Sequence, residues 1–249
     1  LVDEIIRLDQ PEAFKEMFLV VIQLGAILAV AVMYFQKLNP FSPSKSARQK
    51  QATWALWIKI VIACIPAAVL GLLFDDWMEA HLYNAYVVAS TLIIYGVLFI
   101  VLENSSITAN PSITKVGHVS TKTALFIGLF QLLSLVPGTS RSGSTILGAM
   151  VLGCSRGVAA EFSFFLGIPV MFGASFLKLV KFFVKGNVLT GPQIFYTILG
   201  MAIAFGVSVY SIQFLMGYVR RHDFKFFGYY RIILGVVVLA YFGITALAA

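Results

Sequence analysis

Long apolar stretches alternate with short polar ones along almost the whole chain. Six of the apolar stretches reach the length of about 17–25 residues that a helix needs to cross a bilayer. The spans predicted from this pattern are 17–35, 57–74, 85–102, 159–183, 194–218 and 229–247. The pattern therefore predicts an all-α, polytopic membrane bundle, and we expect residues 1–249 to form a single integral membrane domain.

A further apolar stretch, 123–136, is too short to cross. It stops at Pro137, and as a helix it would be about 21 Å long, against about 30 Å for a hydrocarbon core. The apolar segment after Thr145 is shorter still. Two half-length helices on either side of a polar loop predict a re-entrant hairpin, which enters the bilayer and returns to the same side.

Charge supports this arrangement. Lys and Arg exceed Asp and Glu by 18 to 11. In a membrane protein such an excess is expected in cytoplasmic loops, so we expect no nucleic-acid partner. If the hairpin returns to its own side, the basic segments 37–50, 103–122, 154–157 and 218–228 all share that side. The acidic segment 75–84 then lies opposite, and Lys178, Lys181 and Lys185 are the exception to the rule.

The loop between the two half-helices, PGTSRSGST at 137–145, holds one arginine among five hydroxyl residues. A charged side chain near the middle of a bilayer costs about 2.5–3.5 kcal/mol, so Arg141 is expected to have an anionic partner. Its planar guanidinium matches the oxygens of phosphate or carboxylate. One alternative is a purely structural loop in which Arg141 pairs with a carboxylate such as Glu161.

The residues around Arg141 favour a phosphate site. Gly138 and Gly143 let backbone N–H groups approach an anion closely, and a helix N-terminus carries partial positive charge. We expect Ser142 or Ser144 to cap a half-helix that begins near Thr145. The hydroxyl groups that could bind phosphoryl oxygens belong to Thr139, Ser140, Ser142, Ser144 and Thr145.

Three other polar features are weaker candidates. Gln23, inside the first span, either forms a hydrogen bond between helices or lines the pocket. Glu161 could orient Arg141. Glu12 and Glu16 are four residues apart, but they precede a span rather than a polar loop, so an exposed pair is the better interpretation. The cysteines and histidines show no metal-ligand spacing, and no metal site is predicted within this chain.

The segment LVPGTSRSGSTI resembles a signature loop of the bacterial undecaprenyl-diphosphate phosphatases, also called bacitracin-resistance proteins. The resemblance extends to VIQLGAILAV, IPAAVLGLLF, SRGVAAEFSFFLGIPVMFGA and YRIILG, and so covers nearly the whole chain. It implies hydrolysis of undecaprenyl diphosphate to the monophosphate carrier lipid of peptidoglycan synthesis, in the bacterial plasma (inner) membrane, with resistance to bacitracin as a consequence.

The resemblance also implies roles for residues. Arg141 would clamp the diphosphate, while Ser140 and Thr145 would bind phosphoryl oxygens or position the attacking group. The family uses a divalent cation, Mg²⁺ or Ca²⁺, and has an inverted-repeat fold with two hairpins. The family's first signature, two glutamates followed by a Ser/Gly/His loop, has no counterpart here, so we expect the chain to start beyond it and to be incomplete.

Other functions stay open at this point. A transporter or flippase of phosphorylated polyprenyl lipid would also place an arginine in a re-entrant loop, and a non-catalytic helical subunit is a third alternative. The attacking group is either water or a serine. The partners expected are the polyprenyl diphosphate lipid and the bilayer, with a homodimer as one alternative for the assembled state.

Overall fold

The computed structural model describes residues 9–219 and 221–248, and their regular structure is helical. The helices are α2 (Glu12–Val21), α3 (Gln23–Met33), α4 (Phe35–Leu38), α5 (Ala47–Leu82), α6 (Ala85–Glu103), η1 (Val116–His118), α7 (Thr121–Leu132), η2 (Leu133–Leu135), α8 (Arg141–Val151), α9 (Arg156–Val184), α10 (Gly191–Val219) and α11 (Lys225–Ala248). The predicted all-α class is confirmed.

Six helical segments in the described residues are long and apolar enough to span a membrane, as the sequence predicts. Several of their ends, such as Glu12, Ala47 and Arg156, lie further out than predicted because polar flanking residues continue the helices. Helix α5 begins at Ala47 because Ser46 and Gln49 form a capping box: the Ser46 hydroxyl accepts from the Gln49 N–H, and the Gln49 side chain accepts from the Ser46 N–H. Hydrophobicity alone therefore marks the membrane-spanning part of a helix, not its ends.

The chain divides into two compact units, with boundaries inside α9 and α10. Unit 1 comprises Leu1–Asn39 and Gly167–Phe214, and unit 2 comprises Pro40–Leu166 and Leu215–Ala249. In unit 1, a Cβ on Gly25 would lie 2.0 Å from the Met201 carbonyl oxygen, so the backbones of α3 and α10 are in close contact. The expectation of a single membrane domain stays a prediction.

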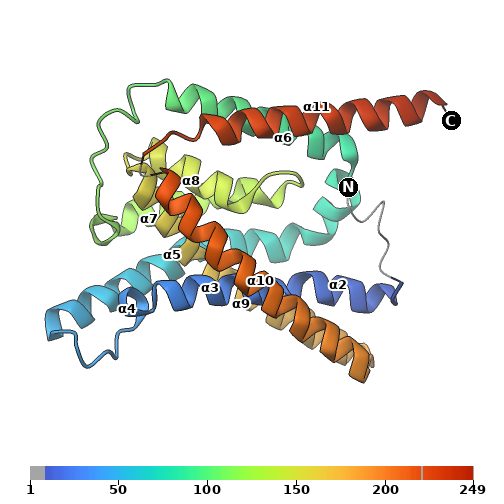
Figure 1. Cartoon of the computed structure of the whole chain (residues 1–249), viewed down its shortest axis with the longest axis horizontal. Helices are drawn as coiled ribbons and strands as arrows, with labels where there is room; N and C mark the ends of the chain where they lie inside the picture. The colour runs from blue at the N-terminus through green and yellow to red at the C-terminus, as the bar shows by residue number, and fades with distance from the viewer. Residues whose placement is uncertain (1–8, 220, 249) are drawn as a thin grey trace. The chain divides into compact units, whose positions relative to one another are not determined.

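Unit 2 is assembled through similar close approaches of helices. Figure 1 shows α11 running alongside α6. A Cβ on Gly96 of α6 would lie 2.6 Å from the carbonyl oxygen of Gly228 on α11, and one on Gly128 of α7 would lie 2.2 Å from that of Ala63 on α5. Small residues at such contacts let helices pack backbone to backbone, as is common in membranes.

The predicted re-entrant hairpin consists of α7, η2, a short loop and α8 (Figure 1). Its two ends lie together: the Ile113 N–H donates to the Gly153 carbonyl at 2.9 Å, and the Ser155 N–H donates to the Ile113 carbonyl at 2.9 Å. The chain therefore leaves α8 beside the segment that leads into α7. Because α7 and α8 enter and return at the same end, they form a hairpin rather than one crossing.

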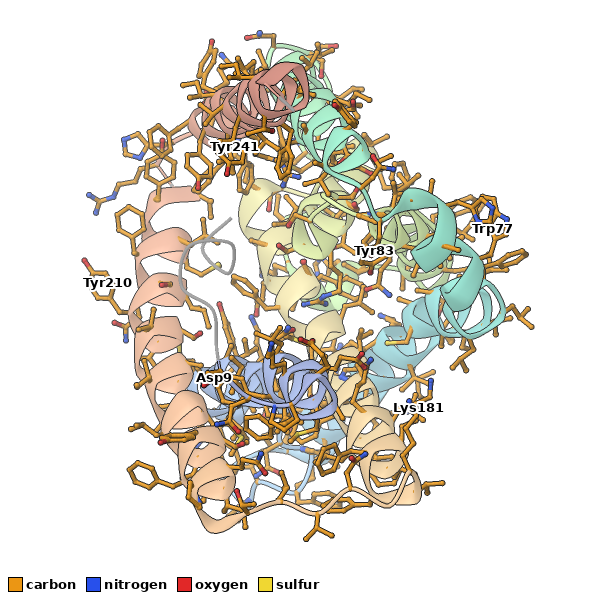
Figure 2. All side chains as sticks on the ribbon, turned by 90° about the vertical axis from the view of Figure 1, so that its right-hand side faces the viewer. Asp9, Trp77, Tyr83, Lys181, Tyr210 and Tyr241 are labelled. Atoms are coloured by element: carbon orange, nitrogen blue, oxygen red, sulfur yellow. The ribbon has the colours of Figure 1, made fainter. Side chains whose placement is uncertain are left out.

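Large apolar and aromatic side chains cover the outside of the helices. Tyr210 of α10 is 72% exposed and points away from its helix (Figure 2). Trp77, near the carboxyl end of α5, and Tyr241 of α11 are likewise exposed (Figure 2). Such a surface suits contact with lipid, with aromatic residues able to sit at the membrane interface.

Candidate active site

The loop of the hairpin lies against α6. Gly138 has φ +82°, in the region that glycine adopts readily. A Cβ at this position would lie 2.3 Å from the Thr91 Oγ1 and 2.5 Å from the Val88 carbonyl oxygen, both on α6. Thr91 also donates a hydrogen bond of 2.8 Å to the Pro137 carbonyl. The sequence PG at 137–138 thus allows the backbone to turn in direct contact with a spanning helix.

Helix α8 begins at Arg141, directly after this turn. Ser140 has extended backbone angles, and its Oγ accepts a hydrogen bond of 3.1 Å from the Gly143 N–H, so it is the N-cap. The prediction of a cap at Ser142 or Ser144, with a helix beginning near Thr145, is wrong. Those residues already lie within helical turns, where their side chains cannot reach forward to a free N–H.

Arg141 is half-buried at the first position of α8. Its Nη1 atom is fully buried, and the side chain is close enough to the Cys64 thiol on α5 for the two to interact electrostatically. The segment PGTSRSGST is neither an unbroken helix nor an ordinary solvent loop. The structure thus places the guanidinium at the positive end of a helix, inside the bundle of unit 2.

Two of the predicted hydroxyl groups face the protein interior. Ser144 and Thr145 are both 0% exposed. The Thr145 Oγ1 lies 2.6 Å from the Ser163 Oγ on α9, and the Ser144 Oγ donates to the Tyr95 hydroxyl on α6 at 3.3 Å. These bonds fix the first turn of α8 between α6 and α9, while the predicted contacts of Ser144 and Thr145 with substrate stay predictions.

A second arginine reaches the loop from the last helix. The Nη2 of Arg231 on α11 donates to the Gly138 carbonyl at 3.0 Å, and its guanidinium carbon lies 5.7 Å from the centroid of the Tyr95 ring. A Cβ on Gly143 would lie 3.3 Å from the Arg231 Nη1. Sequence analysis did not select Arg231. The available signal was an arginine inside the predicted span 229–247, since a charge there usually faces a functional cavity.

Two polar atoms at this place are buried without a hydrogen-bond partner among the described residues: the Arg231 Nε and the Thr139 Oγ1. Both can donate a hydrogen bond, and more than about nine in ten buried polar groups in proteins have a partner. Ser140 and Ser142, whose hydroxyls lie 3.2 Å apart, are half-buried beside them. The loop, α8 and Arg231 thus form a positively charged site that has unused hydrogen-bond donors. Such a site can bind an anion with several oxygens.

The remaining candidates lie in different settings. Gln23 belongs to unit 1, is exposed, and donates to the Leu19 carbonyl in the preceding turn, so this bond is local rather than between helices. Glu161 is 9% exposed on α9, and its predicted effect on Arg141 stays a prediction. Glu12 and Glu16 form ion pairs with Lys15 at 2.7 Å and Lys178 at 3.4 Å, as expected for exposed carboxylates.

Within the part of the chain that the structure describes, no three His, Cys, Asp or Glu side chains come together as metal ligands. The described residues therefore do not form a site that fits the divalent cation implied by the resemblance. Glu103, a buried carboxylate at the end of α6, is already engaged by Arg156 and by the Phe224 N–H at 2.9 Å. We derive no chemical step through a metal.

The comparison with known protein families identifies the chain. The family model described as "Bacitracin resistance protein BacA" matches residues 1–237. The chain belongs to the bacitracin resistance protein BacA family. It is accordingly a multi-pass protein of the bacterial plasma (inner) membrane, which agrees with the six apolar helices in the described residues that could span a membrane.

Several curated BacA-family relatives carry the name undecaprenyl-diphosphatase. The protein of Streptococcus thermophilus is 57% identical over 241 residues, which cover 97% of this chain and 84% of the relative. That of Lactobacillus delbrueckii subsp. bulgaricus is 58% identical over 96% of this chain and 86% of its own length. That of Enterococcus faecalis is 54% identical over 97% of this chain and 87% of its own length.

Proposed function

We propose that the loop 137–145 and Arg231 bind the diphosphate group of undecaprenyl diphosphate, and that the chain acts as an undecaprenyl-diphosphatase. Relatives with this name are 54–58% identical to nearly the whole chain. The reaction breaks the bond between the terminal phosphorus and the bridging oxygen, adds the elements of water, and leaves inorganic phosphate and undecaprenyl phosphate. The product lipid serves as the carrier for peptidoglycan and cell-wall synthesis, and its supply underlies resistance to bacitracin.

The observation that carries the site assignment is that two arginines meet one helix N-terminus inside an apolar bundle. Each guanidinium at membrane depth costs about 2.5–3.5 kcal/mol, and two at one helix N-terminus favour the binding of an anion with several negative charges. A diphosphate carries enough negative charge to offset both. The N–H groups at the start of α8 and the spare donors of Arg231 and Thr139 supply further hydrogen bonds to its oxygens.

The chemistry assigned to these residues is electrostatic. As the bridging bond breaks, negative charge grows on the leaving and equatorial oxygens, and a fixed guanidinium stabilises it more in the transition state than in the bound substrate. We assign this role to Arg141, because it lies at the first position of α8, and assign binding of the diphosphate to Arg231, Ser140 and the backbone of Gly138–Gly143.

Two further expectations accompany the proposal. The family resemblance implies a divalent cation, Mg²⁺ or Ca²⁺, which the described residues alone would not hold, and loss of activity with EDTA that is restored by either ion tests this expectation. A homodimer and a monomer are the two alternatives for the assembled state, and native mass spectrometry in detergent distinguishes them.

The test measures phosphate release and lipid translocation side by side in proteoliposomes. Arg141→Ala should lower the rate of phosphate release by about 10²–10³-fold. Arg231→Ala should lower it by about 10–100-fold, as expected for a lost hydrogen bond to a charged group. Arg221→Ala, an exposed arginine in the loop before α11, is the matched control and should have no effect.

The outcomes separate the candidate functions. Release of phosphate that depends on both arginines supports the phosphatase. Movement of intact undecaprenyl diphosphate across the bilayer without phosphate release would overturn the proposal in favour of a transporter. A protein with neither activity that tolerates Arg141→Ala would be a non-catalytic subunit.

A further inference from the structure

We propose that Tyr95 is a positioning residue for the anion site: its ring holds the Arg231 guanidinium in place, and its hydroxyl is not required for this role. The inference rests on the proposed function and deepens it, because it names what orients one of the two arginines. Tyr95 lies on α6, so it joins the two elements of the site, α8 and α11, to a third helix.

The contacts of Tyr95 are made by both parts of its side chain. The ring faces the Arg231 guanidinium, whose central carbon is 5.7 Å from the ring centroid, a distance at which a cation and an aromatic face attract each other. The hydroxyl accepts a hydrogen bond of 3.3 Å from Ser144, one turn into α8. Tyr95 is only 6% exposed, so it makes these contacts inside unit 2 and is shielded from bulk water.

The ring leaves Arg231 little freedom. The guanidinium carbon lies over the Tyr95 ring, and the Nη2 donates to the Gly138 carbonyl at 3.0 Å. The Nη1 is then directed toward Gly143, where an added Cβ would lie 3.3 Å away. A flexible arginine side chain held on two sides presents its remaining donors in one direction, toward the N-terminus of α8. Such pre-organisation lowers the cost of binding an anion.

The two parts of the side chain can be tested separately. Tyr95→Phe keeps the ring and removes the hydroxyl, and it should retain kcat/KM for phosphate release within about 3-fold. Tyr95→Leu removes the ring, and it should lower kcat/KM by about 10-fold, a value between those of exposed and desolvated cation–aromatic contacts. Phe99→Leu is the matched control: it is another buried aromatic residue of α6, but it packs on Phe224 and should not affect the reaction.

A double-mutant cycle shows whether Tyr95 acts through Arg231. If it does, Tyr95→Leu should have less than about a 2-fold effect in a protein that already carries Arg231→Ala. If Tyr95 had a purely structural role, Tyr95→Leu would lower kcat/KM by the same factor in the wild-type protein and in the Arg231→Ala protein. A full Tyr95→Leu penalty in the Arg231→Ala protein, or an equal penalty for Phe99→Leu, would overturn the inference.

A binding measurement separates this inference from the proposed function. The dissociation constant of inorganic pyrophosphate, measured by calorimetry on the purified protein, should rise about 10-fold in Tyr95→Leu and remain unchanged by that substitution in the Arg231→Ala background. If the wild-type protein releases no phosphate but shows this coupling, the proposed function fails and the positioning role stands. If it releases phosphate without the coupling, the positioning role fails alone.

Discussion

Replacing Gly138 by alanine tests how firmly the hairpin loop is held against α6. Two costs add in this variant. A residue with a Cβ pays about 1–2 kcal/mol in the left-handed region that Gly138 occupies at φ +82°. The new Cβ would also lie 2.5 Å from the Val88 carbonyl oxygen, which belongs to a helix backbone and cannot give way, so the loop must move.

The bonds lost in that movement set the size of the effect. The loop would lose the bond of 2.8 Å from Thr91 to the Pro137 carbonyl and the bond of 3.0 Å from Arg231 to the Gly138 carbonyl. A neutral bond contributes about 0.5–1.5 kcal/mol and a bond to a charged group about 1.5–3 kcal/mol. With the backbone cost, Gly138→Ala should lower the free energy of unfolding by about 3–6 kcal/mol.

The chain offers a matched control for the backbone cost alone. Gly186 has φ +78°, but an added Cβ there meets nothing within 4 Å. Gly186→Ala should therefore cost only about 1–2 kcal/mol. Thermal and denaturant unfolding in detergent, followed by tryptophan fluorescence, measures both variants, and phosphate release measures the site. If Gly138→Ala were as stable as Gly186→Ala and fully active, the loop would not be packed on α6 as described.

Three other features give quantitative expectations. Glu103→Gln removes the buried carboxylate that binds the partly exposed Arg156 and should cost about 1.5–3 kcal/mol of stability in denaturant unfolding, and unchanged stability would contradict this ion pair. Ser163→Ala removes the 2.6 Å bond to Thr145 and should cost about 1–3 kcal/mol, so unchanged unfolding would show that α8 is held otherwise. Burial raises the pKa of Cys154 to about 11, so a water-soluble maleimide at neutral pH should label this thiol only after unfolding, provided that the other cysteine is replaced; rapid labelling of the folded protein would contradict its burial.

The spanning helices and the hairpin could be predicted because bilayer thickness translates directly into the length of an apolar stretch. The stretch 123–136 is too short to cross, and the structure indeed turns it back through α8. Helix ends were predicted less well. The cap of α8 lies at Ser140 because the backbone there is extended, a property that a run of similar hydroxyl residues does not reveal.

Arg231 shows why part of the site could not be predicted. It is 93 residues from Gly138, whose carbonyl it binds, and only the packing of α11 along α6 brings the two together. Sequence periodicity describes which residues share a face of one helix, not which helix that face meets. The arginine inside the last span was visible, but its partner loop was not.

An experimentally determined structure of the protein with inorganic pyrophosphate bound tests the central claim most directly. We expect the anion to lie at the N-terminus of α8, with its oxygens within hydrogen-bond distance, about 2.7–3.2 Å, of the guanidinium groups of both Arg141 and Arg231. Pyrophosphate bound elsewhere in the protein, with either guanidinium turned away from it, would contradict the account.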